Sequence, residues 1–397
     1  MRIRLALLTF LLWILTGGPV LAAEPPDGTD TAEPAAAAQR QLEAVDTAAL
    51  ETFLKEVSQT WEGYGPEISL RDFLQAQQSG EDSRFSLTAI LSGLIRYLIR
   101  EVVANAGLLA RLVLLAIVAA LLQQMQSAFA SEATGKLAQT VVYLALVGLA
   151  VTGFGLAITT ARQAMDQLAG FMLAMLPTLL AVLAGIGGVT SAALFHSLLM
   201  TLTSAASSLM VTVVFPLIFL SAVLDVVSGL HDQLKLTGLA GLLRQVAMYT
   251  LSLMFTVFLG LSAVKGTLGA ITDGLSVKTA KFAISSFVPV VGKMFSDASE
   301  LILGSGVLLK NALGMVGLAA VFFITIFPLL KILSLVAIYQ LAAAAVQPVG
   351  ADQIARMLNT MARSLQMVFA AVAVVALMFF LGITAIVGAG NAAMMVR

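Results

Sequence analysis

Long apolar stretches separated by short polar breaks dominate the chain after residue 103. A hydrocarbon core about 30 Å thick needs roughly 20 apolar residues per helical crossing, and these stretches have that length. Closed β-barrels are excluded, because their strands alternate between apolar and polar residues and the long apolar runs here do not. The pattern therefore predicts an all-α protein that forms a polytopic transmembrane helix bundle of seven or eight spans.

Seven of the predicted spans are long enough to cross a bilayer, and the eighth is short. The seven are Ala104–Met125, Leu137–Ile158, Leu168–Val189, Ala205–Val227, Val246–Val264, Ala312–Leu330 and Leu365–Gly388. The eighth, Ile332–Val346, is separated from its predecessor only by Pro328 and Lys331. Lysine and arginine residues on the predicted loops weakly favour eight spans with the C-terminus outside.

The first 23 residues have the pattern of a secretory signal peptide. Arg2 and Arg4 precede a short apolar run, and a Gly-Gly-Pro breaker leads to small residues at Ala22 and Ala23. We expect cleavage after one of these two alanines, with an uncleaved anchor as the alternative. Cleavage would place the mature N-terminus on the extracytoplasmic side.

Between the signal peptide and the first span, the chain is polar and acidic. Residues 24–86 contain 13 acidic and 4 basic residues, a net charge of −9, whereas residues 87–397 carry +7. We interpret 24–39 as a disordered acidic tether, because it is rich in Pro and Ala and has no aromatic residue. Residues 40–103 are predicted to form small extracytoplasmic amphipathic helices, followed by membrane helices over 104–271 and 312–397.

Composition agrees with a membrane protein and excludes several other classes. The chain is 59% hydrophobic and 11% charged, with a mean hydropathy of +0.97. Its lysines and arginines are too dispersed to indicate a nucleic-acid patch. It has no cysteine, and its two histidines, His196 and His231, have no partner at metal-ligand or proton-relay spacing. No nucleotide-binding or hydrolase motif occurs, so we predict no catalytic residue, no metal and no cofactor, and no enzyme activity.

Two charged residues fall inside the predicted spans. Arg111 lies in the first span and Asp225 near the end of the fourth. Such charges mark substrate or ion pathways in many membrane proteins, but Arg111 can also extend to the interface, and Asp225 can be paired structurally. Small residues are abundant on the spans, and they favour a tightly packed bundle or a homo-oligomer.

The segment 272–311 has the most individual sequence in the chain. It is apolar enough to enter the membrane, yet it carries Lys278, Lys281, Lys293 and Asp297 around helix breakers at Pro289 and Gly292. A broken or re-entrant helix pair and an amphipathic loop on the membrane surface both fit this pattern. In either case, Asp273 and Ser276 are candidate helix caps.

A family resemblance emerges in the same segment. The run from Lys278 through Phe282 and Ala283, the Phe-Val-Pro-Val-Val-Gly sequence around Pro289, and Met294 to Ala298 resemble the most distinctive stretch of the stage III sporulation protein AE family. Leu309 to Ala312 and Phe327-Pro328 follow where similar residues are expected. The order of signal peptide, polar region and multi-span body also fits this family.

The resemblance implies a membrane subunit of a secretion-like channel or export apparatus that links mother cell and forespore and is required for sporulation after engulfment. It implies a location in the mother-cell membrane around the forespore. The implied partners are other membrane proteins of the sporulation operon and a forespore membrane protein. It transfers no catalytic residue, and the cognate ATPase of the family is a separate protein. A stand-alone secondary transporter and a non-conducting membrane scaffold remain the alternatives.

Overall fold

The computed structural model describes residues 51, 52, 55, 87–124, 132–229, 236–287 and 291–395. Within these ranges the chain is helical and contains no strand. The predicted signal peptide and acidic tether lie outside the described residues, as does His231.

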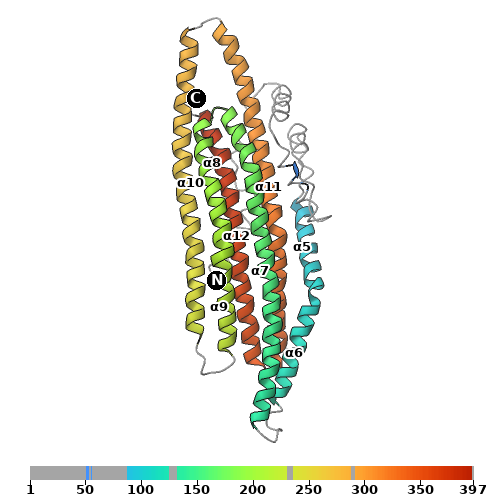
Figure 1. Cartoon of the computed structure of the whole chain (residues 1–397). Helices are drawn as coiled ribbons and strands as arrows, with labels where there is room; N and C mark the ends of the chain where they lie inside the picture. Colours follow the sequence, from blue (N-terminus) through green and yellow to red (C-terminus); the bar gives the residue numbers. More distant parts are fainter. Residues whose placement is uncertain are drawn as a thin grey trace.

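Long helices build the fold and pack side by side along the length of the molecule, with α5 and α6 running in one direction in succession and α8 continuing through a short segment into α9 (Figure 1). They are α5 (Leu87–Ala104), α6 (Ala106–Gln124), α7 (Glu132–Gly185), α8 (Val189–Leu209), α9 (Phe215–Ser228), α10 (Thr237–Phe287), α11 (Val291–Val346) and α12 (Asp352–Met395). A π-helical segment, η3 (Met210–Val214), joins α8 to α9, and a 3-10 turn, η4 (Gln347–Val349), follows α11.

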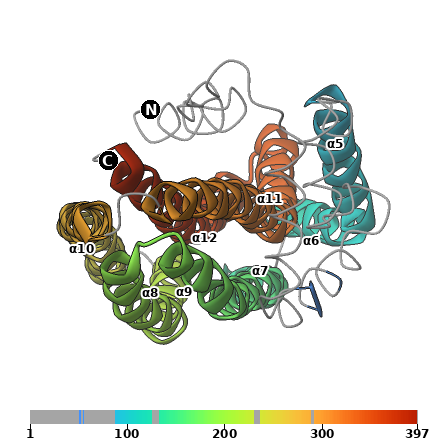
Figure 2. The same ribbon diagram turned by 90° about the horizontal axis from the view of Figure 1, so that it is seen from above.

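Seen from above, the helices form a slab (Figure 2). The helices α11 and α12 run through its middle, α7, α8 and α9 cover one side, and α10 and the α5–α6 pair lie at opposite ends. Glycines allow the closest approaches in the core. A Cβ atom on Gly317 of α11 would lie 2.1 Å from the Met175 methyl group of α7. The hydroxyl of Tyr339 on α11, which is fully buried, donates a hydrogen bond of 2.5 Å to the Ala150 carbonyl of α7.

The predicted count of seven or eight spans is not confirmed by the described residues. Five helical stretches are long and apolar enough to cross a membrane, and the α5–α6 pair, bent by 46°, would be a sixth if it forms one span. Two pairs of predicted spans are single continuous helices in the structure. Leu137–Ile158 and most of Leu168–Val189 lie in α7, and both Ala312–Leu330 and Ile332–Val346 lie in α11.

The polar breaks inside α7 and α11 do not end these helices. The hydroxyl groups of Thr159 and Thr160 in α7 donate to the carbonyls of Gly155 and Leu156, at 3.0 and 2.9 Å. In α11 the helix continues through Pro328, although proline removes one backbone donor. The hydropathy pattern alone therefore predicts breaks between spans at positions where the backbone is helical.

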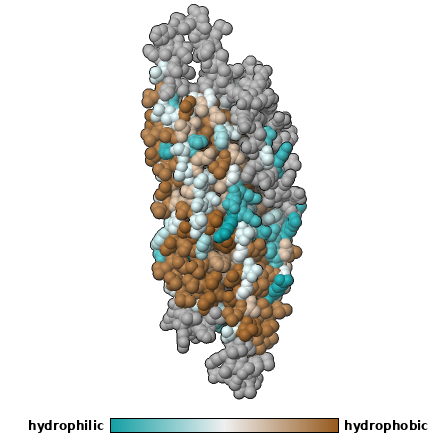
Figure 3. All heavy atoms as spheres, in the orientation of Figure 1, coloured by the Kyte–Doolittle hydropathy of each residue, from teal (hydrophilic) through white to brown (hydrophobic). Residues whose placement is uncertain are grey.

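The helices are longer than a bilayer is thick. With a rise of 1.5 Å per residue, the 54 residues of α7 extend over about 81 Å, against about 30 Å of hydrocarbon. The lower half of the surface in Figure 3 is largely hydrophobic, and a hydrophilic patch lies above it at mid-height. Near its middle, α7 exposes the polar residues Arg162, Gln163 and Asp166. Parts of the bundle therefore extend beyond the membrane core.

Candidate functional site at the hairpin of α10 and α11

The segment 272–311, singled out by its sequence, forms the two arms of a helical hairpin, which we call the hairpin from here on. Its first arm is the end of α10 and its second arm is the start of α11. In Figure 1 these arms extend past the ends of the other helices at the top of the view. The described parts of both arms, residues 272–287 and 291–311, are continuous helix.

The candidate functional residues are distributed over both arms. Lys278, Lys281 and Phe282 are on α10, and Gly292, Lys293 and Asp297 are in the first two turns of α11. Pro289 lies outside the described residues, and its position next to both helix ends is known from the sequence alone. The fold thus brings the candidate residues to one end of the molecule. Whether that end re-enters the membrane stays a prediction.

Asp273 fixes the base of the first arm. Its carboxylate oxygens accept hydrogen bonds from the backbone N–H groups of Thr190 and Ser191, at 2.8 and 2.9 Å. These groups belong to the first turn of α8, where helix geometry leaves N–H donors without a partner. The negative charge also interacts favourably with the positive end of the α8 dipole. Asp273 is only 1% exposed, so little water competes for these bonds.

The expectation that Asp273 caps a helix is confirmed, but the helix is α8 and not its own. Ser276, the other expected cap, lies inside α10 and begins no helix. One turn before Asp273, a Cβ atom on Gly269 would lie 2.6 Å from the Ser191 hydroxyl oxygen and 2.9 Å from the Ser191 Cα. Gly269 therefore lets α10 approach α8 closely enough for the Asp273 carboxylate to reach the backbone.

Lys310 fixes the base of the second arm. Its side chain is completely buried, and its Nζ donates a hydrogen bond of 2.9 Å to the Val387 carbonyl of α12. A glycine again lies one turn away, since a Cβ atom on Gly314 would lie 2.4 Å from a Val387 methyl group. Each arm therefore joins a neighbouring helix through one charged residue and one glycine four positions apart. In the sequence, Lys310 stands out only within the run Leu309 to Ala312 of the family resemblance, and its spacing from Gly314 is the signal that could have found this contact.

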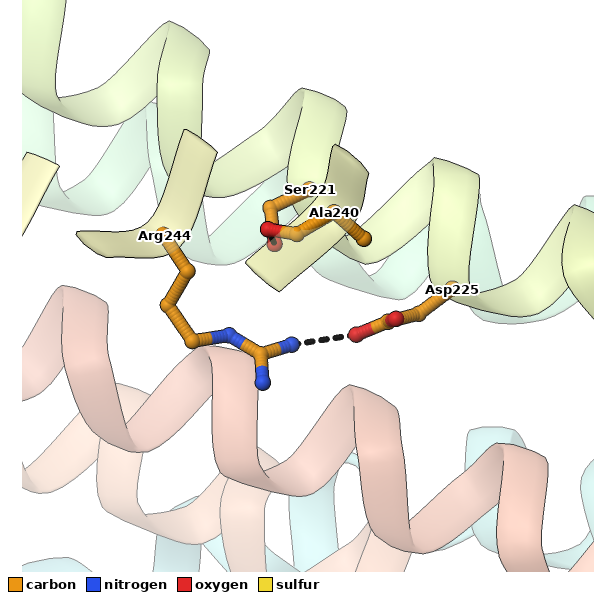
Figure 4. A network of polar contacts seen from close by, with 4 residues as sticks. All are labelled: Ser221, Asp225, Ala240 and Arg244. Atoms are coloured by element: carbon orange, nitrogen blue, oxygen red, sulfur yellow. Dashed lines mark hydrogen bonds and ion pairs between the residues drawn. The ribbon is translucent and has the colours of Figure 1, made fainter. Parts of the chain in front are cut away.

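Asp225, predicted as an intramembrane charge, forms an ion pair with Arg244. The carboxylate projects from α9 and the guanidinium from α10, the next long helix in the chain (Figure 4). Beside this pair, the Ser221 hydroxyl donates to the Ala240 carbonyl at 2.8 Å. The two contacts join α9 to α10 one turn apart. The geometry thus supports the interpretation of Asp225 as structurally paired, and its partner Arg244 lies between two predicted spans, where nothing in the sequence singles it out.

Arg111 is not part of this network. It is exposed on α6, at a shallow apolar groove formed with Ala110, Leu114, Leu115 and Leu149. No hydrogen bond or ion pair links Arg111 to any other residue that the structure describes. The two intramembrane charges are therefore not brought together as a common ion path would require.

The described part of the chain holds no group of three histidine, cysteine, aspartate or glutamate residues that could bind a metal ion. His196 is exposed on α8. The polar side chains at the hairpin base and at the α9–α10 contact instead hydrogen-bond to helix backbone or to one another. This arrangement positions helices, and the described residues show no set of groups arranged for bond making or breaking.

Known proteins are similar to this chain over most of its length. The family described as stage III sporulation protein AE matches residues 68–390. The chain is also similar to the stage III sporulation protein AE of Bacillus subtilis (strain 168), with 40% identity over 379 residues, which cover 95% of this chain and 93% of the relative. No solved structure matches. The matched region contains the whole hairpin and both contacts at its base.

Proposed function

The chain belongs to the stage III sporulation protein AE family, and from this premise we propose that it is a membrane subunit of a secretion-like channel or export apparatus. In this proposal the apparatus links the mother cell to the forespore and is required for sporulation after engulfment. The observation that carries the proposal is the family match across residues 68–390, which spans every described membrane helix except the last few residues of α12.

The anchored hairpin supports a role in assembly. Its two arms extend beyond the other helices, and each base is held to a different neighbour, α8 or α12. Such a projecting element can contact another subunit without disturbing the packing of the bundle beneath it. We therefore assign the contact with other channel subunits to the hairpin, with Lys278, Lys281 and Lys293 as the charged candidates.

For the location, we propose the mother-cell membrane that surrounds the forespore, with the mature N-terminus extracytoplasmic. The signal-like residues 1–23 and the acidic region after them support this orientation. The proposed partners are other membrane proteins of the sporulation operon and a forespore membrane protein. In this role the chain performs no chemistry itself, and energy for transport comes from a separate protein.

The pairing of Asp225 with Arg244 speaks against a stand-alone secondary transporter, the rival proposal. A transporter needs charged or polar groups that converge on a substrate near the middle of the membrane. Here Asp225 is engaged by a neighbouring helix, and Arg111 lies on the outer surface of α6. A non-conducting scaffold is the other rival, and it would use the same helix contacts without requiring the hairpin lysines.

Deletion of the gene in its spore-forming host tests the proposal. We expect development to stop after engulfment, with vegetative growth unchanged and sporulation restored by the intact gene supplied elsewhere on the chromosome. Pull-down of the tagged protein from sporulating cells should recover other membrane proteins of the operon. Heat-resistant spores at normal yield from the deletion strain would sink the proposal, and solute uptake by the purified protein alone in liposomes would favour the transporter.

A further inference from the structure

The helix α10 has one long face that no other described part of the chain covers. Eleven large apolar residues, three or four positions apart, lie along it, and each is between 41% and 66% exposed. These residues, which we call the outer face of α10, are Leu239, Leu242, Val246, Tyr249, Leu253, Val257, Leu261, Val264, Leu268, Ile271 and Leu275. Their spacing keeps them on one side of the helix from end to end.

All charged residues of α10 between Thr237 and Leu275 turn away from this face. Arg244 pairs with Asp225, Lys265 donates to the Ser197 hydroxyl at 3.3 Å, and Asp273 caps α8. The threonines beside the outer face also need no external partner. Thr256 and Thr267, for example, each donate at 2.9 Å to the carbonyl four residues earlier. The outer face is therefore uncharged, and the hydroxyl groups of these threonines are satisfied within the helix.

Lipid cannot cover the whole of this face. From Leu239 to Leu275 it extends over about 54 Å at 1.5 Å per residue, whereas the hydrocarbon core is about 30 Å thick. Figure 3 shows the same mismatch, because hydrophobic surface continues along α10 at the left edge, level with and above the hydrophilic patch of α7. An apolar surface that extends out of the hydrocarbon marks a protein contact.

We propose that the outer face of α10 binds the same face of a second copy, which makes the protein a homodimer with parallel α10 helices. Two copies inserted in the same direction in one membrane present identical faces to each other around a two-fold axis. A strip about 54 Å long and one helix, about 10 Å, wide gives on the order of 500 Å² per copy. The pair then reaches the area of roughly 1,000 Å² that a specific interface requires.

Gly260 lies at the middle of the outer face and marks the point of closest approach. A Cβ atom there would meet nothing within 4 Å in the chain itself, so its small size serves no contact inside the monomer. Between two α10 helices, a glycine at the crossing point lets the backbones come together. Figure 2 shows α10 at one end of the slab, where a second copy has free access.

Single-cysteine cross-linking tests the dimer directly, because the chain has no cysteine of its own. Leu253→Cys, Val257→Cys and Val264→Cys should each give a covalent dimer when membranes are treated with a mild oxidant. Leu156→Cys on α7 and Leu220→Cys on α9 are matched controls, since those leucines are 40% and 47% exposed but lie on other helices. No dimer from the α10 variants, or equal dimer from the controls, would overturn the proposal.

A second variant tests the close approach. Gly260→Leu, combined with Leu253→Cys, should reduce the cross-linked dimer about tenfold, because the new side chain is accommodated in the monomer but clashes between copies. Gly148→Leu on α7, a position with equally empty surroundings, should leave the yield unchanged. An unchanged yield with Gly260→Leu would rule out the crossing at this residue. Cross-linking is read in non-sporulating cells, so its outcome is independent of the proposed channel role.

Discussion

The Asp273 carboxylate lies 2.8 Å from the backbone nitrogen of Thr190, 83 positions earlier in the chain. A side chain of one membrane helix thus supplies the cap for the start of another. The connection between α7 and α8 is very short, and Gly187 adopts a positive φ of 94° in it, so this turn offers no cap of its own. A change in the packing of α8 should consequently also shift the base of the hairpin.

Asp273→Ala should lower the free energy of unfolding by about 1–3 kcal/mol, because one buried and one partly buried N–H donor lose their acceptor. Asp273→Asn should cost less, since the amide oxygen can still accept one of the two bonds. Thermal unfolding in mild detergent measures both effects. Asp166→Ala, at an exposed position of α7, is the control and should change nothing. Equal stability of Asp273→Ala and the parent protein would contradict the capping role.

Gly269→Ala should destabilise the protein by about 1–3 kcal/mol, because the new methyl group would press against the Ser191 backbone, which cannot move aside without disturbing α8. Gly148→Ala, where no atom lies within 4 Å, should instead be neutral or stabilising by up to about 1 kcal/mol. The same unfolding measurement compares the two variants. The contact is disproved if both glycine variants behave alike.

Asp225→Ala and Arg244→Ala should each destabilise the bundle, and the double variant should lose less than the sum of the two. A coupling free energy of about 0.5–3 kcal/mol is expected for residues in direct contact. The reason is that each single change leaves the opposite charge at a helix interface without its partner. Additive effects in this double-mutant cycle would mean that the ion pair contributes nothing to stability.

Tyr339→Phe should cost about 0.5–1.5 kcal/mol, the usual net value of one hydrogen bond, because it removes the donor to the Ala150 carbonyl without opening a cavity. Tyr249→Phe is the matched control, since its hydroxyl accepts a bond from Gln245 on an exposed part of α10. Denaturation curves of the two variants give the comparison. A smaller loss for Tyr339→Phe than for Tyr249→Phe would contradict the role of this α7–α11 contact.

Lys278→Gln combined with Lys281→Gln should lower the yield of heat-resistant spores while leaving the level of the protein in the membrane unchanged. The lysines are on the projecting arm of the hairpin, away from the buried contacts at its base, so their loss should affect partner binding more than folding. Arg111→Gln, on α6, is the comparison for a charge outside the hairpin. Normal spore yield from the double lysine variant would favour the scaffold alternative.

Helical class and membrane character could be predicted from the sequence, because long uncharged apolar stretches leave the backbone few other options. That α7 is one continuous helix could not be predicted from hydropathy. Arg162 and Asp166 look like loop residues in a hydropathy profile, yet they occupy an exposed side of a helix whose other side carries the buried Ala161 and Met165. The helical spacing of alanines four residues apart was the better indication that the helix continues through these residues.

The segment that forms the hairpin could be singled out from the sequence by its charges and helix breakers, and Asp273 was a candidate helix cap, whereas the role of the candidate residues stays a prediction. The partners of Asp273, Lys310 and Asp225 could not be predicted, because each contact joins helices whose relative placement depends on the packing of the whole bundle. Among the contact residues that the sequence did not single out, Arg244 was the easiest to predict, because it begins the third turn of the helix that follows Asp225.

The π-helical segment before α9 sets the rotational phase of that helix. Met210–Val214 wind more slowly than an α-helix, directly ahead of Pro216, within the helical stretch that runs from α8 into α9. Because a π-turn holds about one residue more than an α-turn, loss of one residue here would convert the segment to regular α-helix and leave α9 close to its present phase. Loss of one residue from the regular helix between this segment and Asp225 would instead turn Asp225 by about 100° away from Arg244, so the chain should tolerate the first deletion better than the second.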